Sequence, residues 1–334
     1  MKTNQNGVLR AFGEWEEQEL LMLSLPHAKS DWAPYLSQIT ASYVEFANVL
    51  CRYQNLLLIA PDERYFEPFK HIKNASFFKC ATNDTWIRDY GAIDVLGENG
   101  AFSYDFSFNA WGGKFESGLD DNVNALLFES GALKGELRRV PFVLEGGSVE
   151  FNGRGVLLTT SKCLLNENRA HSDKGALEIK LKELFNLERI IWLDHGEIIG
   201  DDTDSHIDTL ARFVNEKVIV YCACDDKNDA HFMPLKAMEN ELKNSGFELV
   251  PLFLPRALEF MGRRLGATYC NFVFINDALI VPTYGDKKAD ERALGTLKEV
   301  VKGRDIIGVD ARIFIRQNGS LHCSCQNRFK AARN

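Results

Sequence analysis

Two segments in the second half of the sequence carry residue types that suit nucleophilic and proton-transfer chemistry. Cys323 lies in LHCSCQ, and a cysteine thiolate becomes a nucleophile when a neighbouring base or cation activates it. His206 and Asp208 stand two residues apart in SHID, so a strand there would present an imidazole and a carboxylate on one face. Each also has a plainer interpretation, namely a buried inert cysteine and a structural histidine beside a solvated acidic run.

Three further clusters add carboxylates, an amide and aromatic rings. Trp86, Arg88 and Asp89 lie in NDTWIRDYGAID, which reads as a turn leading into a strand; a packed tryptophan with a local Arg–Asp pair would explain it equally. Glu145 precedes two glycines, which let the backbone approach a ligand closely but also suit a tight turn. Asn271 lies in ATYCNF, the fifth cluster.

The five clusters are spaced almost evenly along the chain. Their markers Asp89, Glu145, His206, Asn271 and Cys323 are separated by 56, 61, 65 and 52 residues. Five similar units arranged around an axis would bring one cluster from each unit to the centre.

Several common cofactor and metal sites lack their sequence signatures. The pairs Cys222/Cys224 and Cys323/Cys325 have a single intervening residue, whereas structural zinc sites use wider spacing, and we expect both pairs to lie in strands where alternate residues share a face. Dinucleotide-binding, P-loop and zincin motifs are missing from the sequence. We expect no metal and no cofactor.

The elements that must position these residues alternate between strands and helices, which predicts an α/β class. No linker, low-complexity tract or composition shift divides the chain, so residues 1–334 are predicted to form one domain. The predicted strands are 20–25, 55–60, 155–160, 189–193, 217–224, 271–282 and 304–310. The predicted helices are 30–54 with caps at Ser30 and Asp31, 176–186, 229–246 ending near Gly246, and 290–303.

The composition and charge of the chain limit the classes of partner that we expect. The 334 residues include 39 basic and 47 acidic side chains, a net charge of −8, and the basic residues form no long run, so we expect no nucleic-acid partner and favour a small cationic ligand. Uninterrupted apolar runs long enough to span a membrane and an N-terminal signal segment are missing, so we expect no membrane partner. Eight cysteines in so long a chain suit reduced thiols in the cytoplasm.

Taken together, the clusters resemble the agmatine deiminase family of the guanidino-group modifying enzymes, the pentein superfamily. The likeness covers nearly the whole chain in seven ordered motifs: 13–27, DTWIRDYGAI (84–93), FSFNAWGGKF (106–115), VLEGGSVEFNGRGVLLTT (143–160), GDDTDSHIDTLARFV (200–214), 267–286 and GSLHCSCQ (319–326). The resemblance implies a five-bladed, pseudo-symmetric α/β propeller, which agrees with the even spacing. It also implies a homo-oligomer.

The resemblance implies a role for each matched residue. Cys323 is the nucleophile and His206 the general acid/base, while Asp89, Asp208 and Glu145 hold the guanidinium. A guanidinium stays charged and offers a planar fork of donors that carboxylates can meet. The implied reaction is hydrolysis of agmatine to N-carbamoylputrescine and ammonia through a covalent amidino-cysteine, in putrescine synthesis. It requires neither metal nor cofactor.

Four more residues are candidates for the substrate site. Trp86 and Trp111 could wall the channel for the four-carbon chain, or pack in the core. Asp202 could face the distal amine or orient its neighbours, and Asn271 could line the site.

Other activities remain open. Deimination of peptidyl-arginine is the alternative, because the two families differ mainly in how open the cleft is. Amidine transfer and catalytically silent binding of guanidino compounds are weaker. Free arginine is disfavoured, since its α-carboxylate would meet the acidic run. Ser205 and Gly319 stand in motifs that depart from the family's usual glycine pattern, which affects substrate choice.

Overall fold

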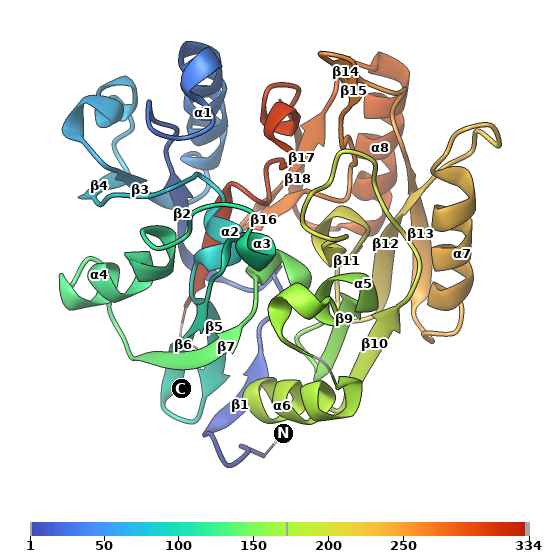
Figure 1. Cartoon of the computed structure of the whole chain (residues 1–334), viewed down its shortest axis with the longest axis horizontal. Helices are drawn as coiled ribbons and strands as arrows, with labels where there is room; N and C mark the ends of the chain where they lie inside the picture. The colour runs from blue at the N-terminus through green and yellow to red at the C-terminus, as the bar shows by residue number, and fades with distance from the viewer. Residues whose placement is uncertain (1, 172, 331–334) are drawn as a thin grey trace.

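Five small β-sheets stand in a ring around a central axis in the computed structural model, which describes residues 2–171 and 173–330 (Figure 1). In hydrogen-bonding order, two sheets have four strands: β19 (Cys325–Phe329), β2 (Gln18–Ser24), β3 (Asn55–Ala60) and β4 (Ala75–Lys79); and β1 (Val8–Ala11), β5 (Ile93–Gly97), β6 (Gly100–Ser107) and β7 (Leu137–Val143).

The other three sheets of the ring have three strands each. They are β8 (Glu150–Phe151), β9 (Val156–Thr160) and β10 (Arg189–Leu193); β11 (Ala211–Phe213), β12 (Val218–Ala223) and β13 (Glu248–Phe253); and β16 (Val273–Ile275), β17 (Ala278–Thr283) and β18 (Asp305–Asp310). A separate hairpin joins β14 (Glu259–Phe260) to β15 (Arg263–Arg264).

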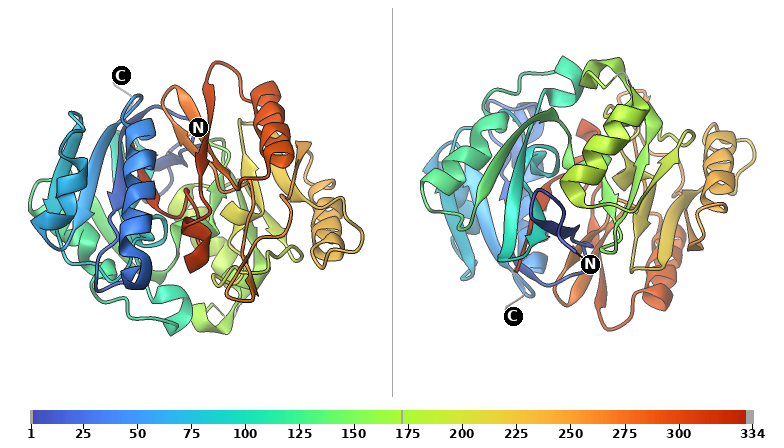
Figure 2. Two further views of the ribbon diagram at one scale, coloured as in Figure 1. Left: turned by 90° about the horizontal axis from the view of Figure 1, so that it is seen from above. Right: turned by 90° about the horizontal axis from the view of Figure 1, so that it is seen from below.

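Every sheet of the ring repeats one topology. A central strand pairs antiparallel with one neighbour and parallel with the other, as in β11–β12–β13 and β16–β17–β18. A parallel pair needs a long crossover, and a helix supplies it in each sheet. These helices are α1 (Leu36–Leu50), α4 (Val123–Glu129), α6 (Lys174–Phe185), α7 (Phe232–Leu242) and α8 (Lys287–Val300), and they lie on the outside of the ring in Figures 1 and 2. This is the five-bladed α/β propeller expected from the sequence.

Strand β19 closes the ring. It comes from the end of the described chain and pairs antiparallel with β2, near the beginning, with Cys325 opposite Leu23. One sheet is therefore built from both ends of the chain, which holds the segment around residue 323 against the first blade.

The sequence explains these elements locally. In β3 the run LLLIA is buried throughout, as expected for a strand covered on both faces. Helix α1 buries Ile39, Tyr43, Phe46 and Leu50, which are spaced by three or four residues along one face. The Asp173 side chain accepts hydrogen bonds from the first backbone amides of α6 and caps it.

Short helical turns lie in the connections between strands, both within blades and between them. They are α2 (Ile87–Tyr90), α3 (Ala110–Gly113), α5 (Ser161–Leu164) and the 3-10 turns η1 (Ala33–Tyr35), η2 (Glu63–Phe69), η3 (Asp120–Asn122), η4 (Gly146–Ser148), η5 (Glu167–Arg169), η6 (Ile207–Thr209) and η7 (Phe314–Gln317). Helices α2 and α3 lie near the centre of the ring in Figure 1. Among the described residues, no helix has the length and hydropathy needed to cross a membrane.

The predicted strands are all found, with one difference. Residues 271–282 form two strands, β16 and β17, joined by a tight turn, rather than one. The predicted strands do not include β1, β4, β5, β6, β7, β8, β11, β13, β14, β15 and β19.

All four predicted helices are found, with ends displaced by one to six residues, and two of the predicted caps are wrong. Pro34 holds residues 33–35 in a 3-10 turn, so α1 begins at Leu36 and neither Ser30 nor Asp31 caps it. Helix α7 ends at Leu242, four residues before Gly246, and its last carbonyls are met by the amide of Lys243.

Candidate active site

The five clusters predicted from the sequence lie in the five connections between consecutive sheets. Asp89 is in α2, Glu145 precedes η4, His206 precedes η6, Asn271 precedes β16, and Cys323 lies between η7 and β19. Because each connection ends at the axis of the ring, residues from the five blades meet there. The five clusters are evenly spaced along the chain because each belongs to a different blade.

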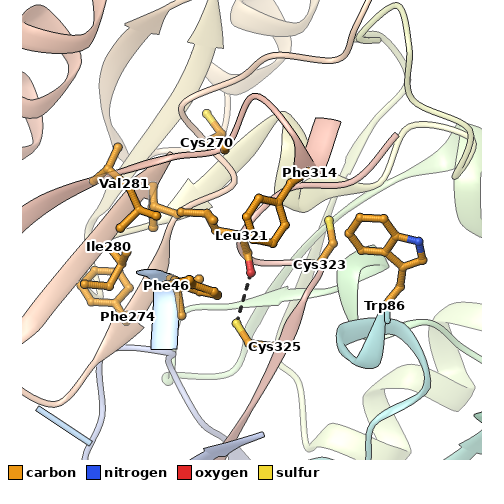
Figure 3. Close-up of a cluster of buried hydrophobic side chains, with 14 of the residues drawn as sticks. Phe46, Trp86, Cys270, Phe274, Ile280, Val281, Phe314, Leu321, Cys323 and Cys325 are labelled. Carbon is orange, nitrogen blue, oxygen red and sulfur yellow. Dashed lines mark hydrogen bonds between the residues drawn. The ribbon is translucent and has the colours of Figure 1, made fainter. Parts of the chain in front are cut away.

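Cys323 lines a cavity together with Asp89, Trp86 and Trp111, and only 7% of its surface is exposed. Its Sγ is 3.4 Å from Asn271 Nδ2 and 3.9 Å from Asp208 Oδ2. Figure 3 shows the Cys323 side chain between the rings of Trp86 and Phe314. Burial, followed by the carboxylates of Asp208 and Asp89, raises the pKa of the Cys323 thiol well above its ordinary value. The resting group at neutral pH is therefore the thiol.

Asp89 is buried and held by neutral donors. Its Oδ1 accepts a hydrogen bond from the Gly147 amide at 2.9 Å, and its Oδ2 accepts one from Trp111 Nε1 at 2.9 Å. Burial raises the pKa of Asp89 well above its usual range, and the nearby charges of Asp208 and Glu145 raise it further. A cation bound beside Asp89 would offset the cost of burying its charge and the repulsion from Asp208 and Glu145.

His206 is present as a neutral imidazole. Burial lowers its pKa to about 3, against the opposing effect of the Asp208 charge. Its Nδ1 is 3.5 Å from Asp89 Oδ1, and neither ring nitrogen makes a hydrogen bond within the described residues. A neutral imidazole with a free nitrogen can accept a proton from a thiol.

His206 and Asp208 do not share a strand, so the predicted reason for their proximity is wrong. His206 is the residue before the 3-10 turn η6, with φ −54° and ψ 140°, and Asp208 lies within that turn. They meet around Gly147, where an added Cβ would lie 2.6 Å from His206 Nδ1, 2.7 Å from Asp89 Oδ1 and 3.1 Å from Asp208 Oδ2. The absence of a side chain at residue 147 allows the three groups to meet.

Asp208 keeps one oxygen free. Its Oδ2 contacts His322 Nδ1 at 2.7 Å, whereas its Oδ1 is buried without a partner. The other nitrogen of His322, Nε2, lies 2.6 Å from Glu14 Oε2, which also accepts from Arg212 at 2.7 Å. The sequence analysis missed both His322 and Glu14, although His322 adjoins the predicted nucleophile.

The two contacts of His322 decide its charge. Burial and the guanidinium groups of Arg212 and Arg88 act to lower its pKa. A neutral imidazole, however, has only one N–H, so at one of the two contacts its unprotonated nitrogen would face a carboxylate oxygen and repel it. Burial also acts to raise the pKa of Glu14, but His322 and Arg212 outweigh it and hold that pKa far below its usual range. We therefore assign His322 as an imidazolium between two carboxylates.

Glu145 stands behind His206 rather than in the cavity. It is fully buried, its Oε1 accepts from Arg169 Nε at 2.9 Å, and its Oε2 has no partner. A carboxylate oxygen of Glu145 lies within 4.8 Å of a His206 nitrogen and of Cys163 Sγ. The geometry favours an action of Glu145 on His206 over direct contact with a ligand.

The cavity walls contain three of the four predicted substrate-site residues. Trp86, Trp111 and Asp202 line it, and Asp202 also accepts from Asn318 at 2.7 Å. Asn271 contacts the Cys323 sulfur from behind instead. The sequence analysis did not identify the remaining lining residues, which are Asp31, Asp84, Phe115, Thr203, Gln317, Asn318 and Gly319.

Two local interpretations of the sequence are wrong. Arg88 does not pair with Asp89, because its guanidinium donates to Gln326 and Asn327, at 2.6 Å each. Cys323 and Cys325 do not share a strand face, since Cys323 lies in the turn before β19 and Cys325 begins that strand.

The arrangement is suited to covalent chemistry on a planar cation. A thiol, a neutral imidazole and two carboxylates with accepting capacity face one buried point, and aromatic rings flank the approach. The carboxylates attract the cation, and the imidazole can move the proton that the thiol must lose.

Comparisons with known proteins agree with this chemistry. The family model for the Porphyromonas-type peptidyl-arginine deiminase matches residues 10–328. A solved structure of a cysteine-to-serine variant of C. jejuni agmatine deiminase with substrate bound is 57% identical, covers 97% of each chain and has a TM-score of 0.95. A second solved structure, C. jejuni agmatine deiminase, has the same identity and coverage with a TM-score of 0.92. An agmatine deiminase of Medicago truncatula is 26% identical over 94% of this chain and 95% of its own.

The close approach at Gly147 generates the first prediction. A Gly147→Ala variant should fold, because Gly147 does not adopt a positive φ, but the new methyl group must displace His206, Asp89 or both. We expect kcat/KM to fall roughly 10²-fold, since a displacement of about 1 Å has that cost in preorganised sites. Thermal unfolding would report stability. Wild-type kinetics in a folded variant would contradict the close packing, and Gly118→Ala, with open space around its Cβ, is the matched control.

The charge of His322 generates the second prediction. Burial acts to raise the pKa of Asp208, but the hydrogen bond from His322 and the charge of His322 help to lower it. Asp208 therefore stays ionised as the pH falls. In His322→Gln the hydrogen-bond donor remains but the charge is lost, so the Asp208 pKa should rise. The acidic limb of the kcat/KM–pH profile should then move to higher pH. An unmoved limb in a folded variant would show that His322 is neutral.

Proposed function

The chain belongs to the Porphyromonas-type peptidyl-arginine deiminase family, and from this premise we propose that it hydrolyses agmatine to N-carbamoylputrescine and ammonia. The observation that carries the proposal is the convergence of Cys323, His206, Asp89 and Asp208, of which Cys323 and Asp89 line one cavity. The C. jejuni structure with substrate bound supports the choice of agmatine over peptidyl-arginine.

Substrate binding begins with charge. The guanidinium of agmatine is placed against Asp89 and the free Oδ1 of Asp208, where its planar fork of donors meets carboxylate oxygens. Its charge offsets the repulsion that raises the pKa values of Asp89 and Cys323. Binding the cation thus makes the thiol of Cys323 easier to ionise in the same step.

Chemistry then proceeds through a covalent adduct. Cys323 Sγ attacks the central guanidinium carbon, and the thiol proton passes to neutral His206. The C–N bond to one terminal amino group breaks, and His206 returns the proton to that nitrogen, which leaves as ammonia. Water then attacks the amidino-cysteine carbon, His206 accepts a proton from it, and cleavage of the C–S bond releases the ureido product and regenerates the thiol.

The remaining residues take supporting roles in this proposal. Glu145 acts on His206 through its charge, because one of its oxygens lies within 4.8 Å of a His206 nitrogen, and Asn271 holds the Cys323 sulfur through its amide. Trp86 and Trp111 flank the methylene chain, and Asp202 lies along the wall where a distal ammonium would pass.

The proposal keeps three further expectations. Residues 1–334 act as one domain, supported by the pairing of β19 with β2. The protein acts in the cytoplasm, supported by eight cysteines that are all free, and it assembles as a homo-oligomer, as the family resemblance suggests.

Ammonia release is the direct test. Purified protein should release ammonia from agmatine and not from free arginine or an N-acylated arginine peptide. Cys323→Ala should lower this rate more than about 10³-fold, as expected when a covalent nucleophile is removed. Cys222→Ala, which alters a buried cysteine in β12, is the matched control and should stay active. Turnover of the peptide would indicate protein citrullination instead. Full activity of Cys323→Ala would show that Cys323 is not the nucleophile.

The pKa shift of Cys323 generates a further prediction. Burial and the Asp208 and Asp89 charges raise the thiol pKa, so alkylation of the free enzyme by iodoacetamide should be slow at pH 7. The rate should rise about tenfold per pH unit toward alkaline pH, because the thiolate fraction grows in that proportion. Asp89→Asn removes one raising charge and should speed alkylation at a fixed pH. Fast, pH-independent labelling of Cys323 at pH 6–8 would show a resting thiolate.

A further inference from the structure

A second cysteine lies beside the catalytic histidine, outside the proposed reaction. Cys163 Sγ, a carboxylate oxygen of Glu145 and a ring nitrogen of His206 all lie within 4.8 Å of one another, and the three residues are buried. They come from three segments, α5, the residue before η4 and the residue before η6. Cys323 is not a member of this cluster; its sulfur contacts Asn271 and Asp208.

The cluster has free ligand atoms in a place where buried polar atoms normally have partners. Arg169 occupies Oε1 of Glu145, which leaves Oε2 without a partner, and both nitrogens of His206 are also unpartnered. These atoms are therefore free to accept a hydrogen bond or to bind a ligand. Substrate chemistry accounts for one side of the His206 ring, but Cys163 does not line the cavity.

The ligand types select a metal class. A thiolate, an imidazole and a carboxylate form a donor set typical of Zn²⁺, whereas Mg²⁺ and Ca²⁺ prefer oxygen ligands alone. Ligand bonds of about 2.0–2.3 Å place the donor atoms about 3–4 Å apart, so the cluster must contract by about 1 Å. Neutral imidazole is the form that coordinates metal, and both ring nitrogens of His206 lack a hydrogen-bond partner among the described residues.

We propose that Glu145, Cys163 and His206 form an inhibitory binding site for Zn²⁺ and similar thiophilic divalent cations. On binding, the Cys163 thiol releases its proton to the buffer, and the two anionic ligands balance the metal charge. The metal occupies a His206 nitrogen, so the histidine can no longer move protons and turnover stops. Metal binding does not depend on the proposed function, whereas the loss of turnover does.

A cobalt titration separates this site from the nucleophile. Co²⁺ added to the wild-type protein should bind with one equivalent and give the near-ultraviolet charge-transfer absorption of a cobalt–thiolate bond. Cys323→Ala should keep the band, and Cys163→Ala should lose it and bind more than about tenfold more weakly. Cys222→Ala is the matched control and should keep it. A band that survives in Cys163→Ala, or one that disappears in Cys323→Ala, would overturn the proposal.

Inhibition provides the second readout. Zn²⁺ should suppress ammonia release from agmatine by the wild-type protein, a chelator should restore it, and Cys163→Ser should be resistant. Equal zinc sensitivity of Cys163→Ser and wild type would also overturn the proposal. If the protein releases no ammonia, the proposed function is wrong, but the metal site is still tested by the cobalt band. If Cys163→Ala does not fold, Cys163→Ser provides the same cobalt comparison.

Discussion

Mutual repulsion among buried carboxylates is the constraint on which the rest of this site depends. Asp89, Glu145 and Asp208 lie at or beside one point on the axis of the ring, and burial opposes ionisation of each. Removing one carboxylate from water without a partner costs several kcal/mol, so the fold must supply compensating charge. It does so unequally, and that inequality creates a site for a cation.

Two of these carboxylates have a compensating cation beside them. Arg169 meets Glu145, and the His322 imidazolium meets Asp208. Asp89 has only neutral donors at hydrogen-bond distance, the Gly147 amide and the Trp111 indole, with neutral His206 at 3.5 Å. Asp89 is therefore the carboxylate whose charge remains for a ligand to balance. Trp111 reaches it from a left-handed backbone conformation, φ 55°, which is the kind of strain that functional sites retain.

The sequence predicted the propeller and the central residues because both leave local signals. Even spacing and ordered motifs singled out Asp89, His206 and Cys323, which the fold brings close together, although the strand invoked for His206 is a 3-10 turn. The charged network behind them left no such signal. Glu14 reaches His322 across 308 residues of sequence. Only the closure of the ring by β19 creates that contact, and no local pattern encodes it.

The cavity itself argues for a ligand with a positive charge at each end. In the proposed complex the guanidinium meets Asp89, and the same cavity is also lined by Asp31, Asp84 and Asp202. Burial, with the charge of Asp31 contributing, raises the pKa of Asp84 to about 7. A carboxyl group poised near neutrality gains most from an ammonium that stabilises its charged form, and it would repel an α-carboxylate at the same position. The same electrostatics that hold a guanidinium against Asp89 therefore disfavour free arginine and favour a decarboxylated, doubly cationic substrate.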